Sequence, residues 1–207
     1  MSRAHRTARA YALLKRQIMT GERHAAERLD PARLARELEV SATPVRDALH
    51  QLHGERLVEA WPRGGFKVPM LSESELSDLY GWNGEIAAGL LRYVRSSLVP
   101  PPTLAPHDPD DLAETARAYF AGLATWLGHG EHQAAIAQAS DRLHRARLAE
   151  GDIFPDAHQE LAALIECQAR ASLSELREFL VTYHQRRQRH ARHIRAAIRE
   201  GKASSRT

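Results

Sequence analysis

The stretch RLARELEVSATPVRDALHQLHGERLVEAWPRGGFKV, residues 33–68, decides the fold of the first third of this chain. Its first half carries apolar residues at helical spacing on both sides of a short polar break. Just before it, Asp30-Pro31 predicts a helix start, because an aspartate accepts free N–H groups and a proline at the first position has none to leave unpaired. After the break we expect a second start, with Thr43 as the cap and Pro44 in the first turn. Two helices separated by a few residues predict a helix-turn-helix.

The second half of the same stretch changes from helical to strand periodicity. Residues 57–61 and 66–68 are short β-prone runs on either side of a Pro-Arg-Gly-Gly turn at 62–65, which predicts a hairpin. An amphipathic helix over residues 6–20, ended by Gly21, precedes the whole motif. Three helices followed by a hairpin with a basic tip predict a winged helix-turn-helix, whose second helix can enter a DNA major groove about 12 Å wide.

Everything after Pro69 has helical periodicity. Ser72 and Ser172 are each followed three residues later by a glutamate, which predicts two capping boxes. We expect helices from Ser72 to about residue 98, from Asp108-Pro109 onward, over 131–149, over 155–171, and from Ser172 to near residue 201, with Gly151 as one of the breaks. The predicted fold is therefore mainly α: a winged helix-turn-helix over residues 1–70, then an antiparallel bundle of about five helices over residues 71–207.

Composition narrows the class of protein. The 207 residues carry a formal charge of +3, and this divides into +5 through Leu71 and −2 beyond it. A basic first third joined to a mildly acidic remainder suggests two parts with different partners. One cysteine excludes an internal disulfide framework and four-cysteine zinc motifs. No apolar run is long enough for a membrane span, and the start lacks the apolar core of a secretory signal. We therefore expect a cytoplasmic, nucleoid-associated protein with no membrane partner.

Residues 33–68 resemble the winged-helix domain of GntR-family bacterial transcription regulators, and the helical part behind them resembles the FadR-type (FCD) effector domain. The resemblance implies a homodimeric repressor that binds a double-stranded DNA operator and responds to a small-molecule effector such as a carboxylate. It also implies that hydroxyls at the recognition-helix start hold phosphates, that an arginine in the first turn reads a base edge, and that the wing tip approaches DNA. By position these residues are Ser41, Thr43, Arg46, Arg63 and Gly64.

Physical chemistry supports this DNA-contact assignment independently. A helix N-terminus offers free N–H groups to a phosphate, and an arginine one turn in can bind guanine O6 and N7 together. Arg33 and Arg36, on the preceding helix, can either contact phosphates or simply face solvent. The chain departs from many relatives at Ala42, where they carry an arginine, so one basic contact is missing.

The resemblance further implies a divalent metal such as zinc or nickel inside the bundle, held by one aspartate and three histidines. The first histidine matches His144. The position one turn before it is Ser140, with Asp141 next to it, and the position of the second histidine is Ala191, flanked by His190 and His193. The arginine that would meet an effector carboxylate is replaced by Asn83. The candidate metal ligands are thus His144, Asp141, His190 and His193, and the candidate effector-binding residues are Asn83 and His144. The other interpretation of these histidines is that they are ordinary polar or surface residues.

Two alternatives to an effector-controlled regulator stay open at this point. One is a DNA-binding protein of the same fold with a degenerate pocket and no effector. The other is a metal-dependent enzyme that uses His144, Asp141 and a C-terminal histidine. The sequence contains no paired general acid and no His-Glu-x-x-His motif. We therefore expect that the protein is not an enzyme.

Overall fold

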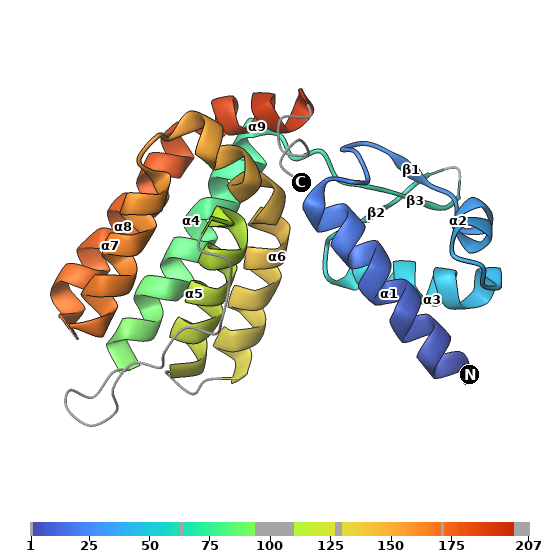
Figure 1. The fold of residues 1–207 in the computed structure, drawn as a ribbon, viewed down its shortest axis with the longest axis horizontal. Coiled ribbons are helices and arrows are strands. Elements are labelled where there is room, and N and C mark those ends of the chain that lie inside the picture. The colour runs from blue at the N-terminus through green and yellow to red at the C-terminus, as the bar shows by residue number, and fades with distance from the viewer. Residues whose placement is uncertain (1, 63, 94–109, 127–129, 171, 201–207) are drawn as a thin grey trace. The chain divides into compact units, whose positions relative to one another are not determined.

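A computed structural model describes residues 2–62, 64–93, 110–126, 130–170 and 172–200 (Figure 1). The chain divides into two compact units at the junction between Met70 and Leu71. Over the described ranges there are nine α-helices and one small antiparallel sheet of three strands. The predicted mainly α fold, a winged helix-turn-helix followed by a helical domain, is confirmed. None of the described helices is long and apolar enough to cross a membrane.

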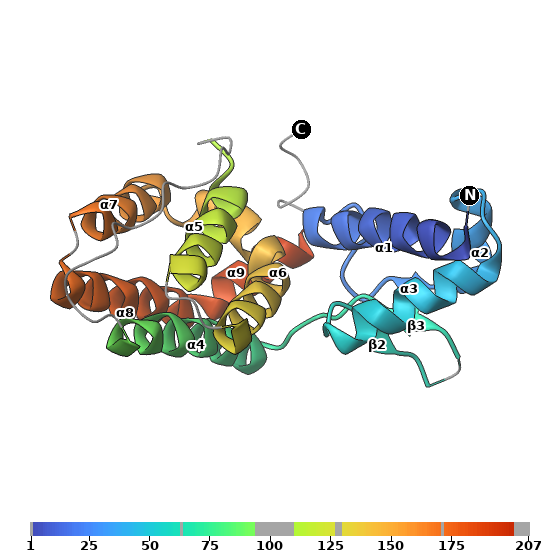
Figure 2. The same ribbon diagram turned by 90° about the horizontal axis from the view of Figure 1, so that it is seen from below.

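The first unit consists of three helices and a three-stranded sheet. In chain order its elements are α1 (Arg3–Thr20), β1 (Arg28–Leu29), α2 (Pro31–Glu37), α3 (Ala42–Gly54), β2 (Glu59–Ala60) and β3 (Phe66–Lys67). The predicted hairpin is the β2–β3 pair, and in Figure 2 α3 lies between α1 and this hairpin. Strand β1 was not predicted, because two residues are too short to show alternation. It pairs with β3, so the sheet order is β1-β3-β2.

The helices of the first unit share one apolar core. The core takes one stripe from each helix and the inward side chains of the sheet, and Leu14, Leu34, Leu49 and Leu52 are fully buried in it. Burying one such side chain contributes about 1.5–3 kcal/mol. This core fixes which face of α3 is left for solvent.

The helix ends of the first unit follow local chemistry with one exception. Gly21 ends α1 with a left-handed φ of 84°, and the Asp30 carboxylate accepts the Arg33 backbone N–H at 2.8 Å, as predicted. The prediction that Thr43 caps α3 is wrong, because the N-cap is Ser41 and Thr43 lies inside the helix. Proline is tolerated anywhere in the first turn, where N–H groups have no helical partner, so Pro44 does not fix the start to one position.

The second unit is a helical bundle. Its described elements are α4 (Glu73–Leu90), a short 3-10 helix (Leu91–Tyr93), α5 (Leu112–Trp126), α6 (Gly130–Ile153), α7 (Ala157–Ala169), α8 (Leu173–Arg189) and α9 (Ala191–Arg199). Helix α4 packs against both α6 and α8, and α5 packs against α6 (Figures 1 and 2). A central position on α4 is therefore the natural meeting point for side chains from three helices.

The boundaries in the second unit correct several predictions. The Ser72 capping box is present, with Ser72 N–H donating to Glu75 at 2.8 Å and Glu75 N–H donating to Ser72 Oγ at 3.2 Å. Ser172 makes no side-chain capping bond. Gly151 does not end α6, which continues to Ile153. A glycine inside a helix costs only about 1 kcal/mol, which packing can offset.

Two further predictions concern the ends of the bundle. The predicted C-terminal helix is divided at His190, which lies between α8 and α9 with φ −106° and ψ 11°. The predicted start at Asp108-Pro109 lies outside the described residues. The described part of α5 begins at Leu112, and the Asp111 carboxylate accepts the Glu114 N–H at 2.9 Å there.

Candidate DNA interface and buried polar cluster

The N-terminal turn of α3 presents its polar side chains to solvent. Val45, Ala48 and Leu49 point into the core, whereas Ser41, Thr43 and Arg46 are exposed. The Ser41 hydroxyl makes no capping hydrogen bond, so it can donate to an outside acceptor. The first N–H groups of a helix also lack internal partners and favour an anion. This end of α3 has the geometry and the partial charge that a DNA phosphate requires.

Arg46 is an exposed cation on the N-terminal part of α3. It makes no hydrogen bond or ion pair with any residue in the described ranges, and the neighbouring Asp47 pairs instead with Arg3 at 3.0 Å. His50 is exposed one turn further along the same face of α3. Sequence reasoning missed His50, although its spacing of four from Arg46 is a signal that could have identified it.

The two arginines of α2 differ in their surroundings. Arg33 donates to Glu27 at 2.9 Å and lies 3.4 Å from Glu37, so its guanidinium is held by two carboxylates. Arg36 is exposed and makes no hydrogen bond or ion pair among the described residues, although its charge helps to lower the pKa of Asp30. The structure therefore favours Arg36 over Arg33 as a cation available to a phosphate.

The wing turn is shaped by two glycines in left-handed conformations. Gly64 has φ +87° and is exposed, and Gly65 has φ +90°. A Cβ on Gly65 would lie 3.3 Å from the Leu29 carbonyl oxygen, so both backbone angle and space require glycine there. Trp61 N–H donates to Gly65 O at 3.0 Å and closes the turn. Arg63, the predicted basic tip, lies outside the described residues.

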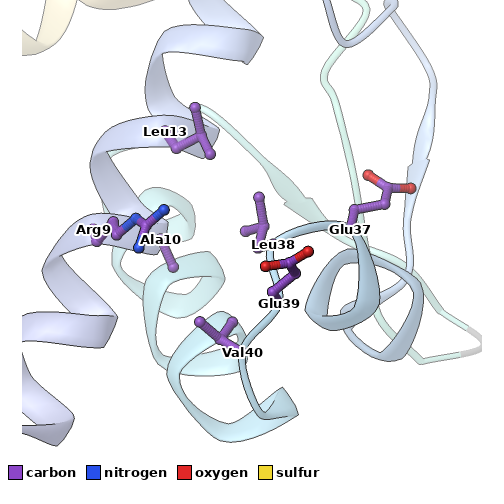
Figure 3. A pocket seen from close by; sticks show the side chains of 7 residues that line it. All are labelled: Arg9, Ala10, Leu13, Glu37, Leu38, Glu39 and Val40. Carbon is purple, nitrogen blue, oxygen red and sulfur yellow. The ribbon is translucent and has the colours of Figure 1, made fainter. Parts of the chain in front are cut away.

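A pocket of about 230 Å³ lies in the first unit between α1 and the segment that joins α2 to α3. Figure 3 shows Arg9, Ala10 and Leu13 of α1 facing Leu38, Glu39 and Val40. Glu37 also lines this pocket and is paired with Arg23. None of the residues that line this pocket belongs to the candidate DNA-contact set, so the pocket is not part of the candidate DNA interface.

The bundle buries two arginines in different electrostatic settings. Arg187 on α8 is fully buried and lies between two carboxylates, with Nε 2.8 Å from Glu150 and Nη1 2.9 Å from Glu160, while its Nη2 has no hydrogen-bond partner among the described residues. Its guanidinium also lies 3.2 Å from the centre of the Tyr183 ring. Glu150 accepts a further hydrogen bond from the Tyr80 hydroxyl at 2.6 Å. This group of residues joins α4, α6, α7 and α8, and the charge of Arg187 is balanced there by the carboxylates of Glu150 and Glu160.

Arg147 on α6 is the second buried arginine, with 1% of its surface exposed. Its Nη2 donates to Asn83 Oδ1 at 3.1 Å, and its guanidinium lies 4.9 Å from the centre of the Phe120 ring. His184 Nε2 lies 3.2 Å from the same Asn83 oxygen. Burial, with Arg147 and Arg187 nearby, lowers the pKa of His184 to about 3, so this imidazole is neutral at physiological pH. Arg147 is thus the charged member of a cluster shared by α4, α5, α6 and α8.

The predicted metal ligands are not brought together. Among the described residues there is no group of three or more His, Cys, Asp or Glu side chains that could hold a metal. The rings of His190 and His193 lie 5.9 Å apart and tilted by 43° beside the α8–α9 break, where His190 also contacts Phe154. The negative charge of Asp141 helps Glu114 to raise the pKa of Arg117. The prediction that Asp141, His144, His190 and His193 together form one metal site is therefore wrong.

The two predicted effector-binding residues are both buried in the bundle. Asn83 is 0% and His144 6% exposed. Burial, and then the positive charge of Arg147, lower the pKa of His144. The charges of Asp111 and Glu114 oppose this shift but do not outweigh burial and Arg147. Sequence reasoning missed Arg147, and the available signal was its spacing of three from His144.

Comparisons with known proteins agree with this architecture. Residues 6–68 match the family described as bacterial regulatory proteins, gntR family. The chain is 33% identical over 81 residues to the HTH-type transcriptional repressor GlaR of Escherichia coli (strain K12), covering 39% of this chain and 37% of that protein. It is 31% identical over 70 residues to the HTH-type transcriptional regulator YdhC of Bacillus subtilis (strain 168), covering 34% and 31%. The aligned stretches thus span about a third of these relatives.

Solved structures extend the likeness to both units. A GntR transcriptional regulator from Rhodococcus sp. RHA1 aligns with a TM-score of 0.68 at 17% identity, covering 90% of this chain and 97% of that one. E. coli McbR/YncC aligns with a TM-score of 0.64 at 18% identity, covering 93% and 98%. The chain therefore shares with them the fold of a winged helix-turn-helix followed by a helical domain.

Proposed function

We propose that this chain is a DNA-binding transcription regulator of the gntR family, of the FadR-type (FCD) subfamily, and that it acts in the cytoplasm as a homodimeric repressor. The observation that carries the proposal is the exposed, unpaired Arg46 at the start of α3, in a domain that matches the gntR family over residues 6–68. The repressor name of the E. coli relative supports the direction of regulation. None of the relatives described above is named as an enzyme.

The proposed DNA contacts divide into positioning and reading. Ser41, Thr43 and Arg36 bind backbone phosphates, together with Arg63 and Gly64 of the wing, and they set the position of α3 in the major groove. Arg46 reads a base edge, most simply guanine, with its planar guanidinium. One such domain covers only a few base pairs, so a homodimer on a two-fold symmetric operator supplies the remaining affinity.

We further propose that the helical unit binds a small-molecule effector at the buried polar cluster around Asn83 and His144. Both side chains keep an unpaired polar atom in a buried place, Asn83 Nδ2 and His144 Nδ1. An effector that binds one arrangement of the dimer better than the other shifts operator affinity by its difference in affinity for the two.

The experiment for the DNA-binding function compares variants that remove one cation each. Fluorescence anisotropy measures binding to the intergenic DNA upstream of the gene and to a scrambled duplex of equal length. Arg46→Ala should weaken specific binding roughly 5–150-fold, the loss of one bidentate base contact. Arg36→Ala should weaken binding to both duplexes and lower the salt dependence by about one ion.

Arg33→Ala is the matched control, because Glu27 and Glu37 already hold its guanidinium. Its affinity for the operator should stay close to that of the wild type. The proposal would be overturned by equal binding of the wild type to both duplexes, or by full specific affinity of the Arg46→Ala variant.

A further inference from the structure

We propose that the exposed face of α9 binds the sugar–phosphate backbone of the DNA that flanks the operator. The helical unit thereby adds a sequence-independent contact to the sequence-specific contact of α3. This inference rests on the proposed DNA-binding function of the first unit. It places a second nucleic-acid contact in a part of the chain that the gntR match, over residues 6–68, does not cover.

The first observation is the concentration of positive charge at the end of the bundle. Residues 189–199 contain four arginines, two histidines and no acidic residue, although the helical part of the chain as a whole is mildly acidic. Arg189, Arg192 and Arg199 are exposed, and none of them makes a hydrogen bond or ion pair with a residue in the described ranges. Arg186, on the preceding turn, is by contrast paired with two carboxylates. The three exposed guanidiniums therefore keep their donors for an anion outside the protein.

The second observation is that the packing of α9 presents its cations on one face. Ala191, Ile194 and Ala197 are buried, because this side of α9 packs against α4 and α6. Arg192 and Arg199 lie on the opposite side, and their spacing of seven residues puts them two turns, or about 10 Å, apart along the helix axis. Duplex DNA carries one negative charge for each 1.7 Å or so of its own axis. Two cations at this separation can therefore each contact a different phosphate.

The same packing decides between two polyanionic partners of α9. A basic amphipathic helix that binds a membrane surface inserts its apolar face among the lipid headgroups. The apolar side chains of α9, led by Ile194 at 0% exposure, are already packed inside the bundle. The helix therefore offers charge but no free apolar face, and backbone phosphates of DNA require only the charge.

The third observation is the position of α9 in its own unit. Arg195 Nε donates to the Leu71 backbone carbonyl at 3.0 Å, and Leu71 is the first residue of the second unit. Figure 1 shows α9 at the end of the bundle where α4 begins. The basic helix is thus fixed to the residue at which the chain enters the bundle from the first unit. Because a short connection between two binding parts gives effective concentrations in the mM range, a weak contact of α9 with DNA already held by α3 is sufficient.

The test uses the full chain and two duplexes that contain the same operator. Hydroxyl-radical footprinting of the upstream intergenic DNA compares the wild type with Arg192→Gln/Arg199→Gln, which we call the α9 variant. The wild type should protect additional backbone beyond the footprint of the α9 variant. Fluorescence anisotropy then compares a core duplex, trimmed to the footprint of the α9 variant, with one extended by about 10 base pairs, one helical turn, on each side.

We expect the extension to matter only for proteins with an intact α9. The wild type should bind the extended duplex roughly 5–50-fold more tightly than the core duplex, the combined effect of two weak exposed charge contacts in each subunit. This preference should fall as salt is raised, because it depends on phosphate contacts. The α9 variant should bind both duplexes with the affinity that the wild type has for the core.

The matched control is Arg170→Gln/Arg177→Gln, which removes the same number of exposed arginines. Arg177 is near the start of α8, about 18 Å along that helix from Arg189, so the control should keep the full preference for the extended duplex. Both double variants should melt close to the wild type, since the changed side chains are exposed. This measurement separates a loss of DNA contact from a loss of folding.

The inference is overturned if the wild type binds both duplexes equally, if the α9 variant keeps the preference, or if the control loses it to the same degree. Co-sedimentation with phosphatidylserine vesicles tests the competing partner. Vesicle binding by the wild type but not by the α9 variant, with no difference between the duplexes, would assign this face to a membrane surface instead. The core duplex tests the proposed function separately, since Arg46→Ala weakens binding to it and the α9 variant does not. Specific binding to the core without a preference for the extended duplex therefore refutes this inference alone.

Discussion

Replacing Arg187 by methionine should destabilise the helical unit more than any surface change. The substitution removes the guanidinium that contacts Glu150 at 2.8 Å and Glu160 at 2.9 Å. It leaves Glu150, which is 0% exposed, with the Tyr80 hydroxyl as its described hydrogen-bond partner. Breaking one side of a buried ion pair costs about 3–5 kcal/mol, because the remaining charge stays buried and uncompensated. At about 3–6 °C per kcal/mol for a domain of this size, the melting temperature should fall by roughly 10–25 °C.

Urea unfolding followed by far-ultraviolet circular dichroism measures this loss directly, since most of the helix signal comes from the second unit. Arg186→Gln is the control on the same helix, because its partner Asp156 is 58% exposed and the pair is partly screened by solvent, although Arg186 also lies 3.4 Å from Glu160. The double variant Arg187→Met/Glu150→Leu should recover part of the loss, since it removes the stranded carboxylate as well. A single-variant loss below about 1 kcal/mol would refute the reasoning, as would a double variant as unstable as the sum of its parts.

Three further expectations use paired positions in the same unit. Ser72→Ala should lower the free energy of unfolding in urea by about 1 kcal/mol, because it removes a capping bond. Ser172→Ala should leave the free energy of unfolding nearly unchanged, because Ser172 makes no capping bond. Equal losses in the two variants would contradict this. Gly84→Ala should cost about 1–3 kcal/mol, since its Cβ would lie 2.8 Å from His184 Cγ, whereas Gly89→Ala, with nothing within 4 Å, should stabilise α4 or leave it unchanged. His184 has its folded pKa lowered from 6.5 to about 3, so the unfolded chain binds a proton first and stability should fall from pH 6.5 downward. His184→Asn should reduce this dependence of the free energy of unfolding on pH, measured by urea titrations at pH 7, 5.5 and 4.5. An unchanged pH dependence would count against a buried neutral imidazole.

The first unit was largely predictable because its signals are local. Asp30 and Gly21 act within one turn of their own helix ends, and the turn chemistry at 62–65 specifies the hairpin without reference to distant residues. Strand β1 could not be predicted, because two residues have no periodicity of their own. It exists only because Leu29 meets Phe66, which lies far along the chain.

The second unit shows where local patterns stop being sufficient. Ser72 and Ser172 have the same capping-box spacing, yet only Ser72 forms one. In the second case the glutamate Oε2 lies 3.9 Å from Cys167 Sγ on α7, a tertiary contact that the local pattern does not contain. The buried cluster is harder still, because Asn83 and Arg147 are 64 residues apart and no motif joins them. The histidine count suggested a metal site, whereas the arrangement in space assembles buried polar side chains around one arginine.

The three-stranded sheet has a consequence for the length of DNA that one domain can read. Phe66 is paired on both sides, with Leu29 of β1 and Ala60 of β2, and its ring lies 5.1 Å from the His50 ring on α3. Strand β1 leads directly into the Asp30 cap of α2. Phe66 therefore connects the wing, α2 and α3, and this connection fixes the distance between the wing and α3. In the proposed complex with DNA, this sheet sets the number of base pairs between the contact of α3 and the contact of the wing. We therefore expect the protein to distinguish operators that differ in that spacing even when their bases match.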